Sequence, residues 1–236
     1  MPDRAPAWSR RAVLLGGAAA ALAACAGRPG TERTAAPPPD VPVTLSTRWE
    51  GRPDGPLPDA GDEGVPFALS LSGTTEPPVV RGGTLVSGIP AGSAGAVYVL
   101  QDLGRRVQRI GARMGFGPGA TSGSVALVAF ASATDLSAHC HMVFTPDRWI
   151  AGVVADGGVV EIDTRYHESP VPQDGRPVSV DVRFDGTTAY VQTPDGVRHT
   201  LRDARFGRTD GRVACWEFYK DTPSSAEARF HETWAG

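Results

Sequence analysis

Hydrophobic and polar positions along this chain follow the short alternation of β-strands rather than the spacing of helices. β-Branched and aromatic residues recur in short runs, and no long stretch repeats its hydrophobic residues at helical spacing. A single short helix is expected over residues 224–229. The pattern predicts strands over residues 67–71, 83–87, 96–100, 107–116, 124–132, 138–144, 149–154, 159–166, 178–184, 188–192, 197–201 and 212–219.

Turn-forming pairs separate these predicted strands. Asp156-Gly157, Asp185-Gly186 and Asp195-Gly196 each stand between two β-rich runs, as tight hairpin turns require. Strands at such regular spacing are typical of an antiparallel sandwich or barrel. We therefore expect one all-β domain over residues 45–236, a length that is sufficient to bury a sizeable core.

The first 25 residues differ from the rest and resemble a bacterial export signal. Arg10-Arg11 precedes a mildly hydrophobic Ala/Gly/Leu run that ends at Leu22-Ala23-Ala24-Cys25. This run is shorter than the roughly 20 apolar residues of a membrane span, which favours a signal peptide over residues 1–24. The twin-arginine route fits better than the general secretory route, although Val13 and Leu15 replace the Phe and Lys of the longer twin-arginine pattern.

The end of the run resembles a lipobox, which implies that the chain is cut before Cys25 and lipidated on that residue. Attached acyl chains would anchor the protein to the cell membrane on its extracytoplasmic side. Residues 25–44 are rich in Pro and Gly and are expected to form an extended tether. The alternative is an unprocessed apolar N-terminus with an incidental cysteine.

Two cysteines, Cys140 and Cys215, remain after Cys25. In an oxidising compartment an even pair predicts a disulfide, and the alternative is two buried free thiols.

Net charge argues against one class of partner. The chain carries a formal charge of −3 at pH 7 and has no basic patch with interleaved aromatic residues. Nucleic acid is therefore not an expected partner.

Four segments carry a resemblance to a known fold family: RPDGPL at 52–57, VQRIGARMGF at 107–116, HMVFTPDRW at 141–149 and ACWEFY at 214–219. Over nearly all of residues 45–236 the pattern resembles the concanavalin A-like, LamG-type jelly roll. The resemblance implies an antiparallel two-sheet jelly-roll sandwich. Members of this superfamily bind glycans, cleave glycans or mediate adhesion, so the fold narrows the substrate class without choosing the chemistry.

Glu161 and Asp163 are the candidate catalytic carboxylates, together with Glu168. The first two resemble part of the Glu-x-Asp-x-Glu core of laminarinase-type glucanases, in which one Glu is nucleophile, the other is acid/base and the Asp tunes them. Glu168 lies about 23 Å from Glu161 along an ideal strand at ~3.3 Å per residue, whereas retaining hydrolysis needs carboxyls about 5 Å apart. Arg165 stands where a carboxylate is wanted, so the motif is broken; a solvated strand face also explains these residues.

Pairing across the Asp156-Gly157 turn predicts the neighbours of this strand. Gly152 falls opposite Glu161, which leaves space for a shallow groove. The same register places Trp149 and Tyr166 on the face opposite Glu161.

Aromatic rings and histidines are the candidate glycan contacts, because sugar C–H groups stack on aromatic faces. The alternative for Trp216 is a place in the core. His139 and His141 also have a spacing that permits zinc, with His167 or Glu168 as a third ligand, although such pairs are common on strand faces. The aromatic candidates are Trp149, Tyr166, Trp216 and Tyr219.

Two further groups of charged residues are candidate sites. Arg109 and Arg113 share a predicted strand face and could bind uronate or phosphate groups, although a solvated strand face is the simpler interpretation. The jelly-roll resemblance implies a structural calcium ion, and oxygen-rich loops suit calcium. The candidate calcium ligands are Asp54, Asp59, Asp62 and Glu63.

These observations predict a membrane-anchored lipoprotein that binds a cell-envelope or environmental polysaccharide through a jelly-roll domain. The first alternative is a glycoside hydrolase or lyase in which Glu161 converges with Glu217 or Glu168. The second is a non-catalytic lipoprotein for protein interaction or adhesion. We expect a monomer that needs no cofactor apart from the candidate calcium ion.

Overall fold

The computed structural model describes residues 37–236 except 119, 121–124, 132–138, 156–157, 209–210 and 225–226. The predicted signal peptide, the predicted lipidation site Cys25 and residues 25–36 of the predicted tether lie outside this part of the chain. Within the described ranges, no helix has both the length and the apolar character needed to cross a bilayer.

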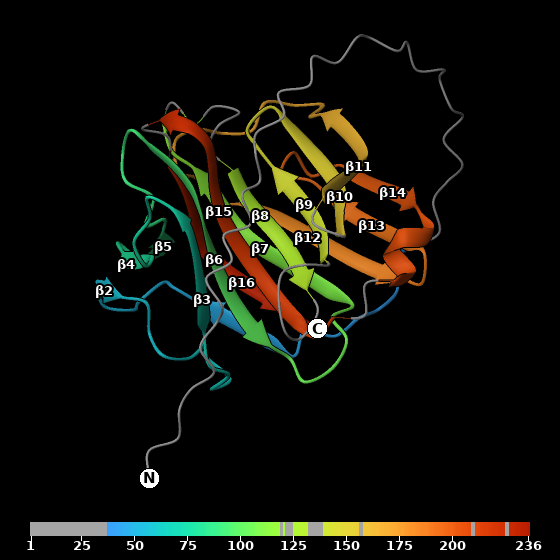
Figure 1. Cartoon of the computed structure of the whole chain (residues 1–236), viewed down its shortest axis with the longest axis horizontal. Coiled ribbons are helices and arrows are strands. Elements are labelled where there is room, and N and C mark those ends of the chain that lie inside the picture. Colours follow the sequence, from blue (N-terminus) through green and yellow to red (C-terminus); the bar gives the residue numbers. More distant parts are fainter. Residues whose placement is uncertain are drawn as a thin grey trace.

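Two antiparallel sheets pack face to face in a sandwich (Figure 1). One sheet contains β1 (Leu45–Arg48), β2 (Gly55–Pro56), β4 (Val79–Arg81), β5 (Thr84–Val86), β7 (Arg109–Phe116), β12 (Val178–Asp185), β13 (Thr188–Gln192), β14 (Arg198–Arg202) and β16 (Ala228–Ala235). Its order is β14-β13-β12-β7-β16-β5-β4-β2, and β1 pairs with β16.

The second sheet contains β3 (Ala68–Gly73), β6 (Ser93–Asp102), β8 (Val125–Ala131), β9 (His139–Phe144), β10 (Arg148–Ala155), β11 (Gly158–Tyr166) and β15 (Val213–Ser224). Its order is β11-β10-β9-β8-β15-β6-β3. A 3-10 turn, η1 (Ala204–Arg208), follows β14. Every strand predicted from the sequence overlaps an observed strand, and the predicted all-β jelly-roll sandwich is confirmed.

Alternation within the strands builds one core between the sheets. Ile110, Met114 and Phe116 of β7 face inward from the nine-stranded sheet, and Trp216 and Phe218 of β15 face them from the seven-stranded sheet. The Trp216 indole N–H donates to the Gly111 carbonyl across the sandwich at 2.9 Å. This bond satisfies the only polar atom of a fully buried side chain and links the middle strands of the two sheets.

The predicted helix over 224–229 is wrong. β15 continues to Ser224, and β16 begins at Ala228 and runs through the middle of the nine-stranded sheet, between β7 and β5. Its side chains alternate, with Phe230 buried against Phe218 at a ring-centroid distance of 4.8 Å. The helix-favouring residues before β16 are too few to form a stable helix, and burial of this alternating face decides the structure.

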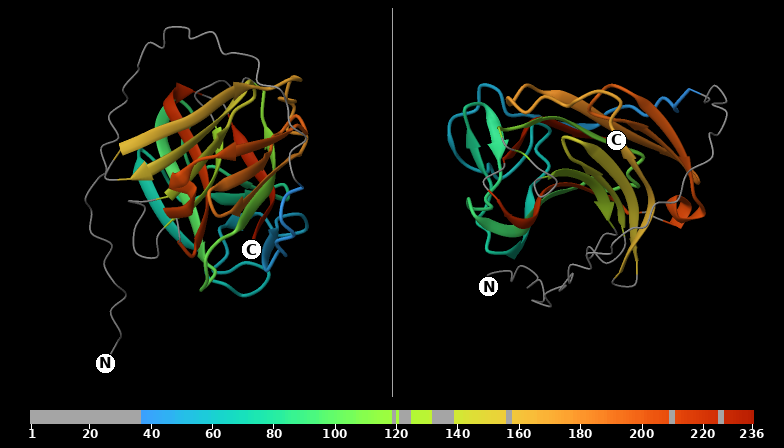
Figure 2. Two further views of the ribbon diagram at one scale, coloured as in Figure 1. Left: turned by 90° about the vertical axis from the view of Figure 1, so that its right-hand side faces the viewer. Right: turned by 90° about the horizontal axis from the view of Figure 1, so that it is seen from above.

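The seven-stranded sheet is strongly curved, and the nine-stranded sheet packs against its convex side (Figure 2, right). We call the outer side of the seven-stranded sheet the concave face. It carries Tyr98 of β6, His141 of β9, and Glu217 and Tyr219 of β15.

The last part of the predicted tether lies on the outer face of the nine-stranded sheet, away from the concave face (Figure 2). The guanidinium groups of Arg183 and Arg109 donate to the carbonyls of Pro39 and Val41, each at 3.1 Å. Asp181 accepts hydrogen bonds from both arginines at 2.8 Å and holds them in place. The chain is therefore bound to the domain several residues before β1.

The central position of β16 predicts the effect of truncating its largest core side chain. Phe230→Ala should reduce the free energy of unfolding by about 3–5 kcal/mol, because the substitution leaves a cavity beside Phe218. Urea unfolding measures the change. Leu71→Ala on the edge strand β3 is the control, since Leu71 is 42% exposed, and it should cost about 1 kcal/mol or less. Equal losses for the two variants would contradict the core packing described here.

Candidate functional site

The centre of the concave face is built by the alternation of β15. Because Trp216 and Phe218 point into the core, Cys215, Glu217 and Tyr219 point to the other side of the sheet. Glu217 pairs with Tyr98 on β6. The acidic side chain of Glu217 is thus placed in the middle of β15, where the adjacent residues of the strand are mostly apolar.

Glu217 is buried and holds two polar partners. Its side chain is 1% exposed, and its Oε2 lies 3.2 Å from Nε2 of His141. The Tyr98 hydroxyl donates a second hydrogen bond to the carboxyl group. Three side chains from β15, β9 and β6 therefore converge on one point of the concave face.

Burial raises the pKa of Glu217 above the ordinary value of 4.5, although the hydrogen bonds from His141 and Tyr98 offset part of this effect. Burial also raises the pKa of the neighbouring Cys215 thiol, and the Glu217 carboxylate adds to that shift. A carboxyl group with a raised pKa keeps its proton closer to neutral pH. Glu217 can therefore donate a hydrogen bond as an acid or accept one as a carboxylate.

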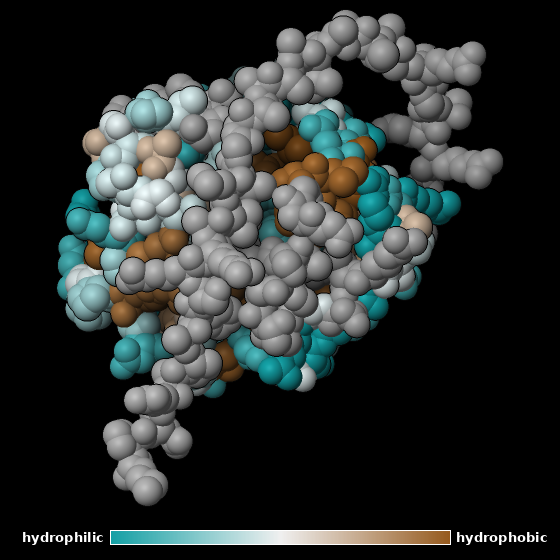
Figure 3. Space-filling model, viewed as in Figure 1, coloured by the Kyte–Doolittle hydropathy of each residue, from teal (hydrophilic) through white to brown (hydrophobic). Residues whose placement is uncertain are grey.

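Apolar and aromatic side chains surround this cluster. Leu100, Val213 and Cys215 form a buried group on the same side of the sheet, with Tyr98 packed against it. Tyr219 is 37% exposed and offers part of its ring to solvent. Where Figure 3 shows this side of the molecule in colour, brown hydrophobic surface is bordered by teal hydrophilic surface.

The sequence pattern contains one signal that points to Glu217 as the centre of the site. Glu217 is the one charged residue of the run Ala214-Cys215-Trp216-Glu217-Phe218-Tyr219, and this run predicts a strand with apolar residues on both faces. A carboxylate in such a run is buried at a cost unless it is paired. Its partners His141 and Tyr98 lie far away in the sequence and could not be assigned from spacing.

His139 and His141 both lie on the concave side of β9, with ring centroids 5.2 Å apart. The predicted third zinc ligand is elsewhere: Nε2 of His167 lies 2.9 Å from the Thr145 carbonyl oxygen, beyond the end of β11. Among the described residues, no group of three or more His, Cys, Asp or Glu side chains is arranged to hold a metal ion.

A β-bulge changes the faces of β11. The predicted pairing of Gly152 with Glu161 is confirmed, but the register then shifts by one residue, so that Asp163 pairs with Ala151 and Tyr166 with Arg148. An extra residue in one strand moves every later side chain to the other face. Tyr166 therefore shares the concave face with Glu161, contrary to prediction.

Two of the aromatic candidates are not at the surface. Trp149 and Trp216 are fully buried in the core between the sheets. Trp149 is covered by the His199 ring at 4.9 Å and by the Arg165 guanidinium group at 5.9 Å. Neither tryptophan presents a ring to a ligand in this structure, because the apolar area of both side chains fills the core.

Tyr166 and Tyr219 are the aromatic candidates with exposed rings, at 71% and 37% exposure.

The three candidate catalytic carboxylates do not converge. Glu161 on β11 is four strands from Glu217 on β15, or about 19 Å at ~4.8 Å per strand. Asp163 faces away from the concave side and binds Arg165 at 2.8 Å. Glu168 follows the end of β11, where its amide donates to Asp195 at 2.7 Å. Glu161 and Asp163 therefore face opposite sides of the sheet, and Glu161 and Glu217 are farther apart than the roughly 10 Å within which paired-carboxylate glycosidases hold their two groups.

The predicted disulfide is absent, and Cys140 and Cys215 are free. β8 lies between the strands that carry them, which separates the backbones by about 9.6 Å. The Cα atoms of a disulfide are usually 4.4–6.8 Å apart. In addition, Cys140 faces the core whereas Cys215 faces the concave side.

The arginine candidates lie on the opposite side of the molecule from Glu217. Arg109 is on the outer face of the nine-stranded sheet and is bound to Asp181, and Arg113 lies 3.9 Å from Glu232. Both guanidinium groups have carboxylate partners within the chain.

Carboxylates of the acidic loop near the start of the domain accept hydrogen bonds from protein partners. Asp54 accepts from the Gly82 amide at 2.8 Å, and Asp62 accepts from the Arg48 amide at 3.0 Å and pairs with the Arg52 side chain. Glu63 accepts from the amide and hydroxyl of Ser46 at 2.8 and 3.0 Å. The backbone carbonyl of Asp59 accepts a hydrogen bond from the Phe67 amide. Calcium binding at this loop stays a prediction.

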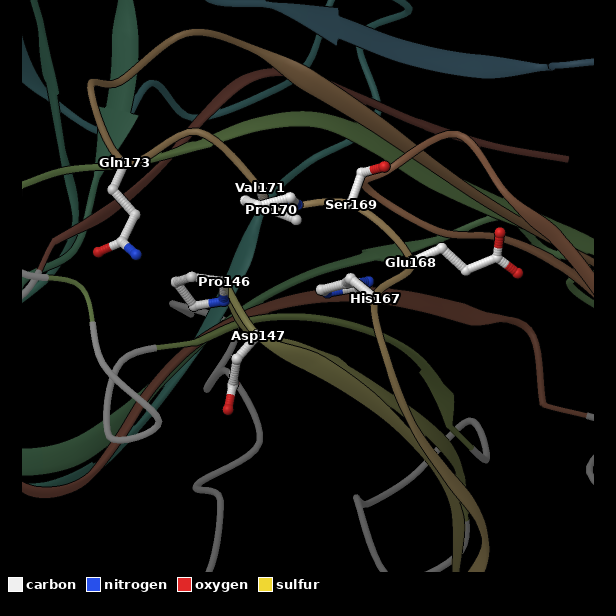
Figure 4. A pocket seen from close by; sticks show the side chains of 8 residues that line it. All are labelled: Pro146, Asp147, His167, Glu168, Ser169, Pro170, Val171 and Gln173. Carbon is white, nitrogen blue, oxygen red and sulfur yellow. The ribbon is translucent and has the colours of Figure 1, made fainter.

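A hollow of about 490 Å³ lies beside the end of β11 (Figure 4). Figure 4 shows that the Asp147 and Glu168 carboxyl groups point in different directions, away from each other. Its polar groups therefore do not converge as those of the Glu217 cluster do. The lining residues are Pro146, Asp147, His167, Glu168, Ser169, Pro170, Val171 and Gln173.

Free cysteines predict that stability does not depend on reducing agent. The unfolding midpoint of the oxidised, purified protein should be the same with and without dithiothreitol. A disulfide that closed the loop from Cys140 to Cys215 would instead contribute about 4 kcal/mol, and its reduction would lower the midpoint strongly. Thiol counting under denaturing conditions provides the second measurement, with two reactive thiols expected from these positions.

The raised pKa of Glu217 predicts a pH-dependent stability difference. Its ionisation opposes folding, so the associated stability is complete below the unfolded value of 4.5 and is lost as pH rises through the folded pKa. Glu217→Gln cannot ionise. The free energy of unfolding of this variant, relative to that of wild type, should therefore rise by up to about 1.4 kcal/mol per pH unit above 4.5. The difference should level off above the folded pKa of Glu217. A difference that stays constant in urea unfolding from pH 4 to pH 8 would contradict this assignment.

Comparison with known proteins identifies the fold. No protein-family model and no curated protein matches the chain. The laminarinase catalytic domain (endo-1,3-beta-glucanase) of Thermotoga petrophila RKU-1 matches with a TM-score of 0.55 and 9% identity, over 82% of this chain and 97% of that one. The Bauhinia forficata lectin in complex with GalNAc matches with a TM-score of 0.51 and 14% identity, over 81% and 97%.

A carbohydrate-binding module gives a similar result. The CBM2 module of the evolved Dit protein of Lactobacillus casei BL23 phage J-1 matches with a TM-score of 0.51 and 10% identity, over 82% of this chain and 94% of that one. At such identities the likeness establishes the fold alone. The chain therefore has the jelly-roll sandwich that is also found in lectins, carbohydrate-binding modules and glycoside hydrolases.

Proposed function

We propose that this protein binds a polysaccharide across its concave face. The observation that carries the proposal is the buried cluster of Glu217, His141 and Tyr98 at the centre of that face. Polar groups that converge within an apolar surface are typical of ligand sites. The fold likeness to a lectin and to a carbohydrate-binding module supports a glycan as the ligand.

The chemistry of the face suits sugar rings. Hydroxyl groups of a sugar can exchange hydrogen bonds with the partly exposed His141, which the buried Glu217 holds in place, and the C–H face of the sugar can stack on Tyr219. From β11 to β3 the sheet spans six strand spacings, or about 29 Å. A polymer that lies across the strands therefore contacts several side chains of the face at once, which adds many weak contacts.

The proposed location of this binding domain is the outside of the cell membrane. The twin-arginine pair and the lipobox-like end of the first 25 residues support export and lipidation at Cys25. The residues that follow Cys25 then form the link between the lipid and the domain.

A second candidate function is polysaccharide cleavage, and the raised pKa of Glu217 favours it. A carboxyl group with a raised pKa keeps its proton to higher pH than an ordinary one and can act as a general acid toward a glycosidic oxygen. The separation of Glu161 from Glu217 disfavours a mechanism in which these two residues act as a pair. Binding is therefore the preferred proposal.

Retention by immobilised polysaccharides tests the preferred proposal. The full chain, purified in a nonionic detergent, is run through native gels that contain laminarin, dextran, polygalacturonate or bacterial cell-wall polysaccharide. Glu217→Gln and Tyr219→Ala should each weaken retention by about tenfold on the polymer that binds. Tyr190→Ala is the matched control, since Tyr190 lies on the outer face of the nine-stranded sheet, and it should leave retention unchanged.

The same samples separate the alternatives. Mass spectrometry of the incubated polymers should show no new oligosaccharides if the protein only binds. Products that are lost in Glu217→Gln would establish cleavage instead. A protein that is retained by none of the polymers would contradict the proposal and would favour the protein-interaction alternative.

A further inference from the structure

Arg148 is a cation on the concave face. It precedes the buried Trp149 on β10, and alternation therefore turns its side chain to the opposite side of the sheet, where it pairs with Tyr166. Among the described residues no carboxylate forms an ion pair with Arg148, and its buried Nε atom has no hydrogen-bond partner. Arg109, Arg113 and Arg183 on the nine-stranded sheet, by contrast, all have such partners.

The carboxylates nearest to Arg148 in the sheet are turned away or occupied. The Asp147 carboxylate accepts from the Thr145 hydroxyl at 2.5 Å. Asp163 lies on the other side of β11, where it binds Arg165. Glu161 accepts from the Thr164 hydroxyl at 2.7 Å and is four residues farther along the hairpin.

Tyr166 is the cross-strand neighbour of Arg148. Paired side chains of neighbouring antiparallel strands have Cβ atoms about 5 Å apart. The Tyr166 ring is 71% exposed, more than any other large hydrophobic side chain of the described residues. The β-bulge in β11 is what brings it to this face, because without the extra residue Tyr166 would point to the other side.

We propose that Arg148 and Tyr166 form an outer subsite of the concave face that takes an acidic sugar unit of the polysaccharide. The planar guanidinium group binds a carboxylate or sulfate through two parallel hydrogen bonds, and the ring stacks on the C–H face of the same sugar. This inference rests on the proposed binding function and narrows its ligand to an anionic glycan.

The subsite is separate from the Glu217 cluster. Arg148 is three strands from β15 and two residues along β10 from the row of Glu217, a separation of about 16 Å. A different unit of the same polymer therefore occupies each place. The Glu217 carboxyl group and the Arg148 guanidinium group therefore lie at different places along a polymer that crosses the concave face.

Binding to three polymers tests this subsite. The full chain in nonionic detergent is titrated with polygalacturonate, dextran sulfate and unmodified dextran, at low and at physiological salt. The two anionic polymers present the carboxylate and the sulfate separately, and the subsite requires tighter binding of at least one of them than of dextran. Arg148→Met keeps the length of the side chain and should weaken binding of that anionic polymer at least tenfold, while Arg148→Lys should keep part of it.

The control is Arg198→Met, which removes the same charge from an exposed position on the nine-stranded sheet. It should leave binding unchanged, and all variants are checked by their unfolding midpoints. If Arg148→Met binds the anionic polymer as wild type does, or if Arg198→Met loses as much, the subsite is overturned. If the protein binds only dextran and Glu217→Gln weakens that binding, the subsite is overturned but the proposed function is kept. If the protein is retained by no polymer, cell-wall polysaccharide included, both are overturned.

Discussion

The register of β15 is the constraint on which the rest of the structure depends. One set of its side chains, Trp216 and Phe218, is fixed in the core by packing and by the indole hydrogen bond to Gly111. Because a strand alternates with a period of two, this fixation also decides that Glu217 and Tyr219 stand on the concave face. Core packing on the opposite face of β15 therefore positions Glu217 for its contacts with His141 and Tyr98.

At the edge of the seven-stranded sheet, the bulge in β11 decides which side chains lie on the concave face, as the alternation of β15 does at the centre. Up to Glu161 the strand follows the simple hairpin register, and beyond it the faces are exchanged. The exchange sends Asp163 and Arg165 toward Trp149 and brings Tyr166 out beside Arg148. One additional residue thus changes both the cover of the core and the composition of the concave face.

Local sequence patterns predicted the structural features that depend on residues close together in the sequence. The hairpin between β10 and β11 was predictable, including the pairing of Gly152 with Glu161, because the sequence Asp156-Gly157 between two β-rich runs predicts a tight turn. The bulge was not predictable; at the bulge the partly buried Ile162 packs against the core, a contact that the strand's own alternation does not indicate. The strand order was not predictable either, and it is the insertion of β8 that keeps Cys140 and Cys215 apart.

Contacts between distant parts of the chain give the site its chemistry. Glu217 and His141 are 76 positions apart, and nothing in the spacing of either residue indicates the other. The central strand β16 was missed for a related reason, because its burial between β7 and β5 outweighs the local preference of the residues before it.

The binding of residues 39–41 to Arg109 and Arg183 has a mechanical consequence. A pull on the N-terminal side of the chain is taken up by the nine-stranded sheet, whereas a ligand on the concave face pulls on the seven-stranded sheet. The tension between the two passes through the packed core, where Trp216 of one sheet is bonded to Gly111 of the other. If the proposed anchor and the proposed polysaccharide are both attached, the domain is a link in series between them, and its resistance is that of the interface between the sheets.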